Sequence, residues 1–211
     1  MHKPCREDAM PYLEKPQLHM VWRADGRRLP IDPMTAEGYI IRTYRPGDEE
    51  HFLELMALMD FDRFDAPKLA YNVARILPEG WFFAVEQSTL EVVGTAMCLH
   101  NYTGHTPFGG DVGWLACRPA HTGKGLGYAL SAHVTNRFHQ AGYARIQLGT
   151  EYHRLPAIKT YLKLGYVPVI YRAEMHELWA EACRQLDWPF TPEAWFPDFP
   201  PSPLDRADES A

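Results

Sequence analysis

Three glycines, Gly123, Gly125 and Gly127, stand within five positions of the stretch RPAHTGKGLGYALSAH at residues 118–133, immediately before an apolar helical pattern. Glycine in a helix interior costs about 1 kcal/mol relative to alanine. A strand that passes through a glycine-rich turn into a helix is an arrangement that binds phosphate, because the first helical amides lack internal partners and glycine has no Cβ to hold a ligand away. The spacing indicates a site for a phosphate-bearing ligand, with a tight turn that binds nothing as the alternative.

Two common nucleotide-binding motifs do not fit this stretch. A P-loop requires GxxxxGK(S/T), and the chain contains no such sequence. A dinucleotide fingerprint requires GxGxxG, whereas the spacing here is GxGxG, with Tyr128 at the position of the third glycine. Neither motif accounts for the three glycines.

The stretch ACRPAHTGKGLGYAL resembles the pyrophosphate loop of the GNAT superfamily of acyl-CoA-dependent N-acyltransferases, usually written (Q/R)xxGx(G/A), with Gly125 and Gly127 at the two small positions. A second stretch, LPAIKTYLKLGYVPV, looks like that family's closing helix-to-strand motif, often AIxLYxKxGF, here residues 157–166. Both motifs stand in the family's order, within a resemblance that covers residues 39–171. The resemblance implies an α/β (α+β) fold with a mixed, mostly antiparallel sheet flanked by helices.

Acetyl-CoA is the cosubstrate that this resemblance implies, without a metal. The amides of residues 122–128 would hold its pyrophosphate, and the strand segment 115–117 would pair with the pantetheine arm. The implied cofactor-binding residues are Leu115, Ala116, Cys117, Thr122, Gly123, Lys124, Gly125, Leu126, Gly127, Tyr128 and Arg154. Thr122 replaces the family's usual Gln or Arg, and Arg154 stands where many members carry an Asn, so Lys124 is expected to supply the missing cation.

Acetyl transfer to an amine requires a base. With a lysine-like pKa near 10.4, only about 1 in 2,500 acceptor molecules is neutral at pH 7. Asp111, eleven residues ahead of Thr122, stands where the histone-acetylating branch of the family carries its catalytic carboxylate; an acid at a strand start or turn is the alternative. His100 and His105 flank the same loop and are alternative bases, or else solvated loop histidines.

The thiolate leaving group requires a proton donor. Tyr161 matches the tyrosine that many GNAT enzymes use to protonate the sulfur of coenzyme A, and a core aromatic is the alternative role. Cys117 suggests covalent acyl transfer, but no base adjoins it in the sequence, so we expect it to pack.

Alternating and helical patterns predict the elements that position these residues, in the order β-α-α-β-β-β-α-β-α-β followed by a further helix. Strands are expected at residues 39–44, 81–86, 92–100, 112–117, 145–150 and 166–171. Asp48 and Asp65 are expected to cap the first two helices, and Pro78 to stop the second. The third helix is expected to end at Gly142, the fourth to run from Pro156 to Gly165, and a last one to lie in 172–188.

Three regions are predicted. Residues 1–38 read as an extended N-terminal arm with one strand-like piece at 18–22, residues 39–171 as the N-acetyltransferase domain, and residues 172–211 as a C-terminal helix with a tail rich in proline and aromatic residues. The tryptophans and phenylalanines of 172–199 carry too much apolar area for solvent, so this segment is expected to pack on the body or on a second copy, as in a homodimer.

Composition narrows the class of protein. A net charge of −6 and a pI of about 5.9 give no general attraction to nucleic acid or to an anionic membrane. No apolar run approaches the ~20 residues of a membrane span, and the start carries acids where a signal peptide is apolar. The four cysteines, Cys5, Cys98, Cys117 and Cys183, are scattered and read as free thiols of a cytoplasmic protein; the ten histidines show no zinc spacing.

The function predicted from these observations is transfer of the acetyl group of acetyl-CoA directly to an amine, on a small molecule or a protein. A non-catalytic acyl-CoA-binding regulatory module on the same fold is the alternative, which the departures at Thr122 and Arg154 keep open.

Overall fold

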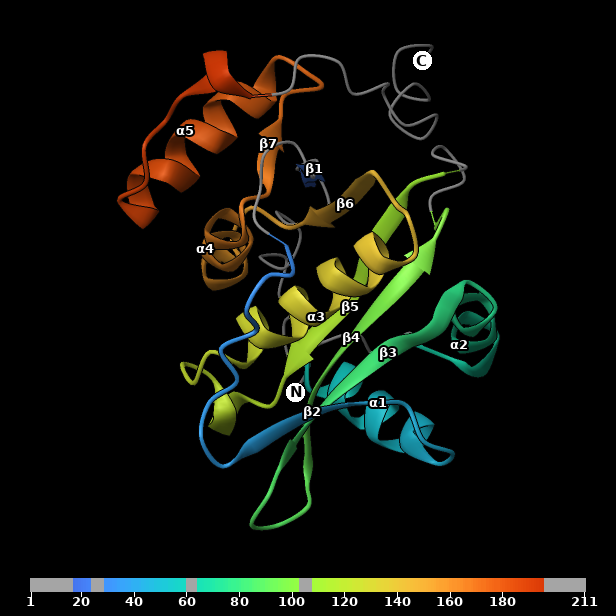
Figure 1. The fold of residues 1–211 in the computed structure, drawn as a ribbon. Coiled ribbons are helices and arrows are strands. Elements are labelled where there is room, and N and C mark those ends of the chain that lie inside the picture. The colour runs from blue at the N-terminus through green and yellow to red at the C-terminus, as the bar shows by residue number, and fades with distance from the viewer. Residues whose placement is uncertain (1–16, 24–28, 60–63, 103–107, 196–211) are drawn as a thin grey trace, which may run out of the picture.

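The computed structural model describes residues 17–23, 29–59, 64–102 and 108–195. Its centre is a seven-stranded sheet in the order β2-β3-β4-β5-β6-β1-β7 (Figure 1). Every neighbouring pair of strands is antiparallel except β5 and β6, which are parallel. The predicted fold class, a mixed and mostly antiparallel sheet flanked by helices, is confirmed.

The strands are β1 (Leu18–Arg23), β2 (Tyr39–Thr43), β3 (Ile76–Glu86), β4 (Val92–His100), β5 (Gly110–Cys117), β6 (Arg145–Thr150) and β7 (Val167–Val169). The helices are α1 (Asp48–Leu58), α2 (Ala66–Val73), α3 (Leu126–Gln140), α4 (Leu155–Leu164) and α5 (Glu174–Leu186), with short 3₁₀ turns η1 (Pro119–His121) and η2 (Pro192–Ala194). The order confirms the predicted elements, but α2 ends earlier than expected. Ile76, which lies before the expected stop at Pro78, starts β3 instead, because it pairs with Leu99 of β4.

The first two helices begin differently from one another. Asp65 caps α2 as predicted, accepting a hydrogen bond from the Lys68 amide. The prediction for α1 is wrong, because its N-cap is Gly47 and Asp48 is the first helical residue. The Asp48 carboxylate is buried and accepts two hydrogen bonds from the Arg42 guanidinium, 2.6 and 2.7 Å long, so an ion pair with β2 replaces the cap.

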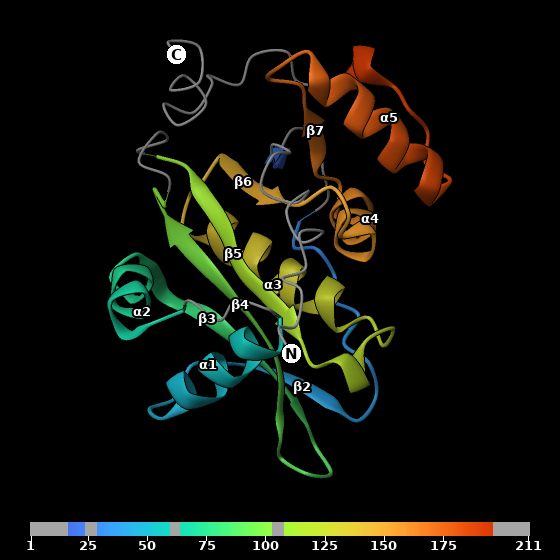
Figure 2. The same cartoon turned by 180° about the vertical axis from the view of Figure 1, so that it is seen from behind.

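The central sheet is covered on both faces, and β3 shows how the sequence achieves this. Trp81, Phe83 and Val85 pack with the buried side chains of α1, whereas the intervening Phe82 and Ala84 pack with those of α3 and α4. Successive side chains of a strand point to opposite faces of the sheet, so an unbroken apolar run places apolar side chains on both faces. Figures 1 and 2 show α3 against one face of the sheet and α1 against the other.

The strand-like piece of the predicted N-terminal arm lies inside the sheet. β1 pairs antiparallel with both β6 and β7, and alternate side chains Leu18, Met20 and Trp22 are fully buried. The Trp22 indole N–H donates to the Leu164 carbonyl at the end of α4. Residues from both sides of the expected boundary at 38/39 therefore build one sheet.

The segment after β7 packs on the body, as predicted, throughout its described part. Trp179 of α5 is fully buried, and Trp188, Phe190 and Trp195 pack against the same core as α3 and α4. The edge-to-face contacts of Trp195 with Trp179 and Phe190, with ring centroids 5.8 and 5.1 Å apart, are a favourable aromatic geometry. The rest of the predicted tail, from residue 196, lies outside the described residues.

The structure also describes the cysteines and the length of the apolar helices. Cys98, Cys117 and Cys183 are free thiols, and Cys5 lies outside the described residues. Among the helices of the described ranges, none is both long and apolar enough to cross a bilayer.

Candidate active site

The candidate site begins where β5 and β6 part. Their parallel pairing consists of two residue pairs, Gly110 with Ile146 and Asp111 with Gln147. Beyond Asp111 the strands diverge (Figure 2), and β5 carries a bulge at which Trp114 adopts a positive φ of 51°. The connection from β5 to β6 runs through the glycine loop and α3, because parallel strands require a crossover. The divergence opens the sheet beside the N-terminus of α3.

A cavity of about 1070 Å³ lies in this opening, lined by β5, the glycine loop, the end of β6 and the start of α4. The structure brings the predicted site residues together there, with a single exception, Lys124. The predicted residues that line the cavity are Asp111, Leu115, Ala116, Cys117, Thr122, Gly123, Gly125, Leu126, Gly127, Tyr128, Arg154 and Tyr161. The volume is at the upper end of the ~300–1,000 Å³ usual for ligand pockets.

The glycine loop presents backbone to this cavity. Gly123 and Gly125 both have φ of +77°, the left-handed region that residues with a Cβ avoid, and Gly125 is the N-cap of α3. The first bond into the helix runs from the Ala129 amide to the Gly125 carbonyl, 3.0 Å long, so the amides at 126–128 have no acceptor within the helix. A Cβ added at Gly127 would meet no protein atom within 4 Å. The loop is thus open to an anion that contacts the chain itself.

The polar side chains of the loop and of α4 have protein partners. Thr122 donates to the Pro119 carbonyl at 2.9 Å, and Arg154 forms an ion pair with Glu151, Nε to Oε2, at 2.8 Å. Lys124 lies outside the cavity lining and donates from Nζ to the Tyr39 hydroxyl at 2.6 Å. Its expected place as the cation of the phosphate site stays a prediction.

Asp111 is the buried acid at the point of divergence. Its side chain accepts hydrogen bonds from Gln147 Nε2 at 2.8 Å and from the Tyr102 amide at 3.2 Å. Burial raises the pKa of this carboxyl above its usual value, against the opposing effect of the two donors. A raised pKa makes a carboxylate a stronger base, which suits proton removal from an ammonium.

Tyr161 faces the same cavity from α4 and is 6% exposed. Burial raises the pKa of its phenol well above the usual value, so the hydroxyl keeps its proton at neutral pH. This is the protonation state that a proton donor requires.

The alternative base His100 and the candidate nucleophile Cys117 are placed less favourably for those roles. His100 does not line the cavity and bonds through Nδ1 to the Tyr143 hydroxyl at 2.6 Å, and His105 lies outside the described residues. Cys117 lines the cavity, but burial raises its pKa to about 12, so the thiol is protonated and a poor nucleophile.

Several polar residues that line the cavity were missed by sequence reasoning, among them Gln147, Lys159 and Lys163. Gln147, which holds Asp111, comes from the strand that Asp111 pairs with, and only strand register reveals this neighbour. Lys159 and Lys163 line the cavity from α4. Their four-residue spacing places them on one face of the helix, a signal that the sequence contained.

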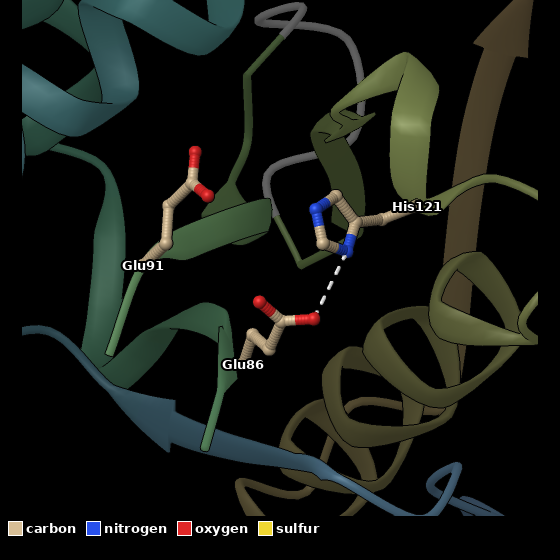
Figure 3. A group of neighbouring side chains, drawn as sticks. All are labelled: Glu86, Glu91 and His121. Atoms are coloured by element: carbon tan, nitrogen blue, oxygen red, sulfur yellow. Dashed lines mark ion pairs between the residues drawn. The ribbon is translucent and has the colours of Figure 1, made fainter. Parts of the chain in front are cut away.

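A possible metal-binding group lies beside the loop, formed by Glu86, Glu91 and His121 (Figure 3). Their ligand atoms lie within 4.8 Å of one another, with Glu86 facing His121 in the figure. Each already has a protein partner: Glu86 accepts from Thr89, Glu91 pairs with Arg118, and His121 bonds to Tyr39. No spacing in the sequence connects these residues, and the expectation of no metal stays a prediction.

Known proteins resemble this chain in sequence and in fold. A family model described as Acetyltransferase (GNAT) family matches residues 43–166. Mycothiol acetyltransferase of Catenulispora acidiphila is 29% identical over 147 residues, which cover 65% of this chain and 46% of that protein. The chain thus spans about half the length of this curated relative.

Two solved structures share the fold. A GCN5-related N-acetyltransferase from Sphaerobacter thermophilus superposes with a TM-score of 0.50 at 24% identity, covering 72% of this chain and 48% of that one. A GCN5-related glucosamine N-acetyltransferase region of a fungal multi-domain GH3 β-N-acetylglucosaminidase gives a TM-score of 0.54 at 14% identity, covering 72% of this chain and 19% of that one.

Proposed function

The chain belongs to the GNAT acetyltransferase family, and from this premise we propose that it transfers the acetyl group of acetyl-CoA directly to an amine. One observation carries the proposal. The open amides at the start of α3 face the same cavity as a buried carboxyl, Asp111, and a buried phenol, Tyr161. A phosphate-binding turn, a base and a proton donor are the three parts that this transfer needs.

The proposed cofactor site combines backbone and charge. The amides at 126–128 and the positive end of the α3 dipole hold the pyrophosphate. Lys159 and Lys163 line the cavity and favour an anionic ligand in a chain whose net charge is −6, while the charge of Arg154 is paired with that of Glu151, which lines the cavity too. Residues 115–117 of β5, which have no partner in β6, offer backbone groups to the pantetheine arm.

The proposed reaction uses the two buried groups in turn. Asp111 takes a proton from the ammonium of the acceptor, through water where needed, and the neutral amine attacks the thioester carbonyl carbon. The C–N bond forms and the C–S bond breaks, while Tyr161 gives its proton to the departing sulfur. The attacking nitrogen loses a second proton, which passes through water to the Tyr161 phenolate, and Asp111 releases its proton to solvent. The products are an amide, coenzyme A and one proton.

Transfer is direct rather than through the enzyme. The protonated state of Cys117, the thiol that lines the cavity, supports this, because an acyl-enzyme route needs a thiolate.

A thermal-shift titration with acetyl-CoA, followed by a thiol-release screen against diverse amines, tests the proposal. Acetyl-CoA at a hundredfold excess over Kd stabilises a protein by about 2.7 kcal/mol, so the melting temperature is expected to rise measurably. Release of coenzyme A with one class of amine identifies the acceptor. Binding without release from any amine would favour the regulatory module, and no shift at millimolar acetyl-CoA would remove both.

A further inference from the structure

The phosphate loop is exposed, and residues outside it make hydrogen bonds to both of its ends. Thr122, Gly123, Lys124 and Gly125 are all exposed, so core packing does not position them. At the β5 end, Arg118 fixes the base of the loop through its amide, which donates to the Val93 carbonyl at 2.8 Å, and through its guanidinium. The other end of the loop, near Lys124, needs a second contact that fixes its position.

The hydroxyl of Tyr39 makes that second contact. It lies 2.9 Å from His121 Nδ1 and accepts from Lys124 Nζ at 2.6 Å, so one oxygen contacts the residues on both sides of Thr122 and Gly123. The same oxygen therefore joins Lys124, from which it accepts, and the imidazole of His121. The Tyr39 ring also lies edge-on to the imidazole, with centroids 5.8 Å apart, and 5.2 Å from the Lys124 ammonium.

Tyr39 is itself rigidly placed. It is 8% exposed and stands at the start of β2, where it pairs with Glu86 of β3. A hydroxyl carried by the sheet therefore holds a loop that glycine makes flexible, since Gly123 is free to adopt many conformations when nothing restrains its neighbours.

We propose that Tyr39 is the positioning residue of the phosphate loop, and that Lys124 acts through the Tyr39 hydroxyl rather than as a direct phosphate ligand. The proposal rests on the proposed acetyl-CoA site. Holding the loop in the conformation that presents its amides removes the ordering cost from ligand binding, so the contact raises affinity without touching the ligand. The absence of Lys124 from the cavity lining agrees with this role.

A double-mutant cycle tests the proposal, with acetyl-CoA affinity measured by calorimetry on Tyr39→Phe, Lys124→Met and the double variant. Loss of the hydrogen bonds of one hydroxyl is expected to weaken binding about 5- to 20-fold. The double variant is expected to match Tyr39→Phe, because both substitutions break the same contact. Tyr44→Phe is the matched control: this tyrosine follows β2, and its hydroxyl binds Glu49, away from the loop.

Trypsin provides a readout without ligand, since it cleaves after Lys124. Faster cleavage there in Tyr39→Phe than in the wild type or Tyr44→Phe is expected, and KM for acetyl-CoA is expected to rise while kcat at saturation changes less than twofold. Equal affinity and equal cleavage in Tyr39→Phe and wild type would overturn the inference and leave the proposed function standing. Multiplying effects in the double variant would overturn it in favour of direct phosphate binding by Lys124. A wild type that does not bind acetyl-CoA would remove the proposed function, and this inference with it.

Discussion

The two sides of the cavity present different chemical groups, backbone amides on one side and buried side chains on the other. At the junction of β5 and α3 the chain presents backbone amides, flanked by glycines with open space around them. At the point where β5 and β6 part, it presents the buried carboxyl of Asp111, held by Gln147, with the phenol of Tyr161 buried in the same cavity. One side is open main chain and the other is buried side chain.

Under the proposed function, this difference gives phosphate binding to one side of the cavity and proton transfer to the other. An amide is present whatever the side chain, so the proposed phosphate site is expected to tolerate Thr122 in place of a long polar residue as long as the glycines keep the backbone accessible. Proton transfer depends on one atom of one side chain and on the burial that sets its pKa, so the other side tolerates no replacement. Substitutions on the catalytic side are expected to act on rate, and those on the loop on affinity.

The largest effect is expected for Asp111→Asn, which keeps the shape of the side chain and removes the base. kcat/KM should fall by about 10²- to 10⁴-fold, the usual contribution of a general base. Because burial raises the pKa of Asp111, wild-type activity should decline on the acid side at a pH above the usual carboxyl range. In the variant the defect should be greatest at low pH, where the acceptor is mostly ammonium, and partly recover at high pH.

Asp48→Asn is the control for this variant. Asp48 is also a buried acid, but it pairs with Arg42 away from the cavity, so its replacement should lower stability and leave the pH–rate profile unchanged. A silent Asp111→Asn, together with a pH-dependent defect in a His100 or His105 variant, would transfer the role of base to that histidine.

A smaller loss, about 10- to 1,000-fold in kcat, is expected for Tyr161→Phe. The bond from the phenol to sulfur is made in the transition state, so acetyl-CoA affinity should be nearly unchanged. Tyr166→Phe is a matched control. Tyr166 is also buried and its hydroxyl is hydrogen-bonded to Thr135, but the residue does not line the cavity. A Tyr161→Phe enzyme that keeps the wild-type rate, with chemistry shown to be rate-limiting, would contradict the assignment.

The smallest of the three effects is expected on the loop side. Gly127→Val should weaken acetyl-CoA binding by at least about 10-fold, or about 1.4 kcal/mol, with little change in melting temperature. A Cβ there meets no atom of another part of the protein within 4 Å and extends from a residue that lines the cavity. Gly127→Ala, with one small methyl group, should bind almost normally. Calorimetry on both variants distinguishes a blocked cavity from a damaged fold. Full acetyl-CoA affinity in Gly127→Val would contradict the assignment of ligand binding to the loop side.

Local patterns predicted most of the elements, and the exceptions have a common cause. The glycine stop of α4 at Gly165, with φ of +88°, and the cap at Asp65 are local chemistry, and both were predicted. Ile76 continues the helical pattern of α2 but pairs with Leu99, and Asp48 resembles a cap but binds Arg42. In both cases a partner more than five residues away outweighed the local preference.

The site shows the same division between local and distant information. The glycine spacing indicated the phosphate loop, and the motif around Tyr161 indicated the closing helix. Nothing in the sequence near Lys124 indicates that the hydroxyl of Tyr39, 85 residues earlier, accepts a hydrogen bond from its ammonium. Similarly, Gln147 becomes the partner of Asp111 only because β5 and β6 are in register.

By itself, the sequence determined the backbone chemistry of the protein: where helices begin and end, which turn exposes its amides, and which residues are acid, phenol and thiol. Those properties depend on neighbours within a few positions. Tertiary structure alone decided that β1 enters the sheet between β6 and β7, that the sheet opens at Asp111, and that burial raises the pKa of both Asp111 and Tyr161. The physical reason is that strand pairing and desolvation depend on groups that the chain brings together only when it folds.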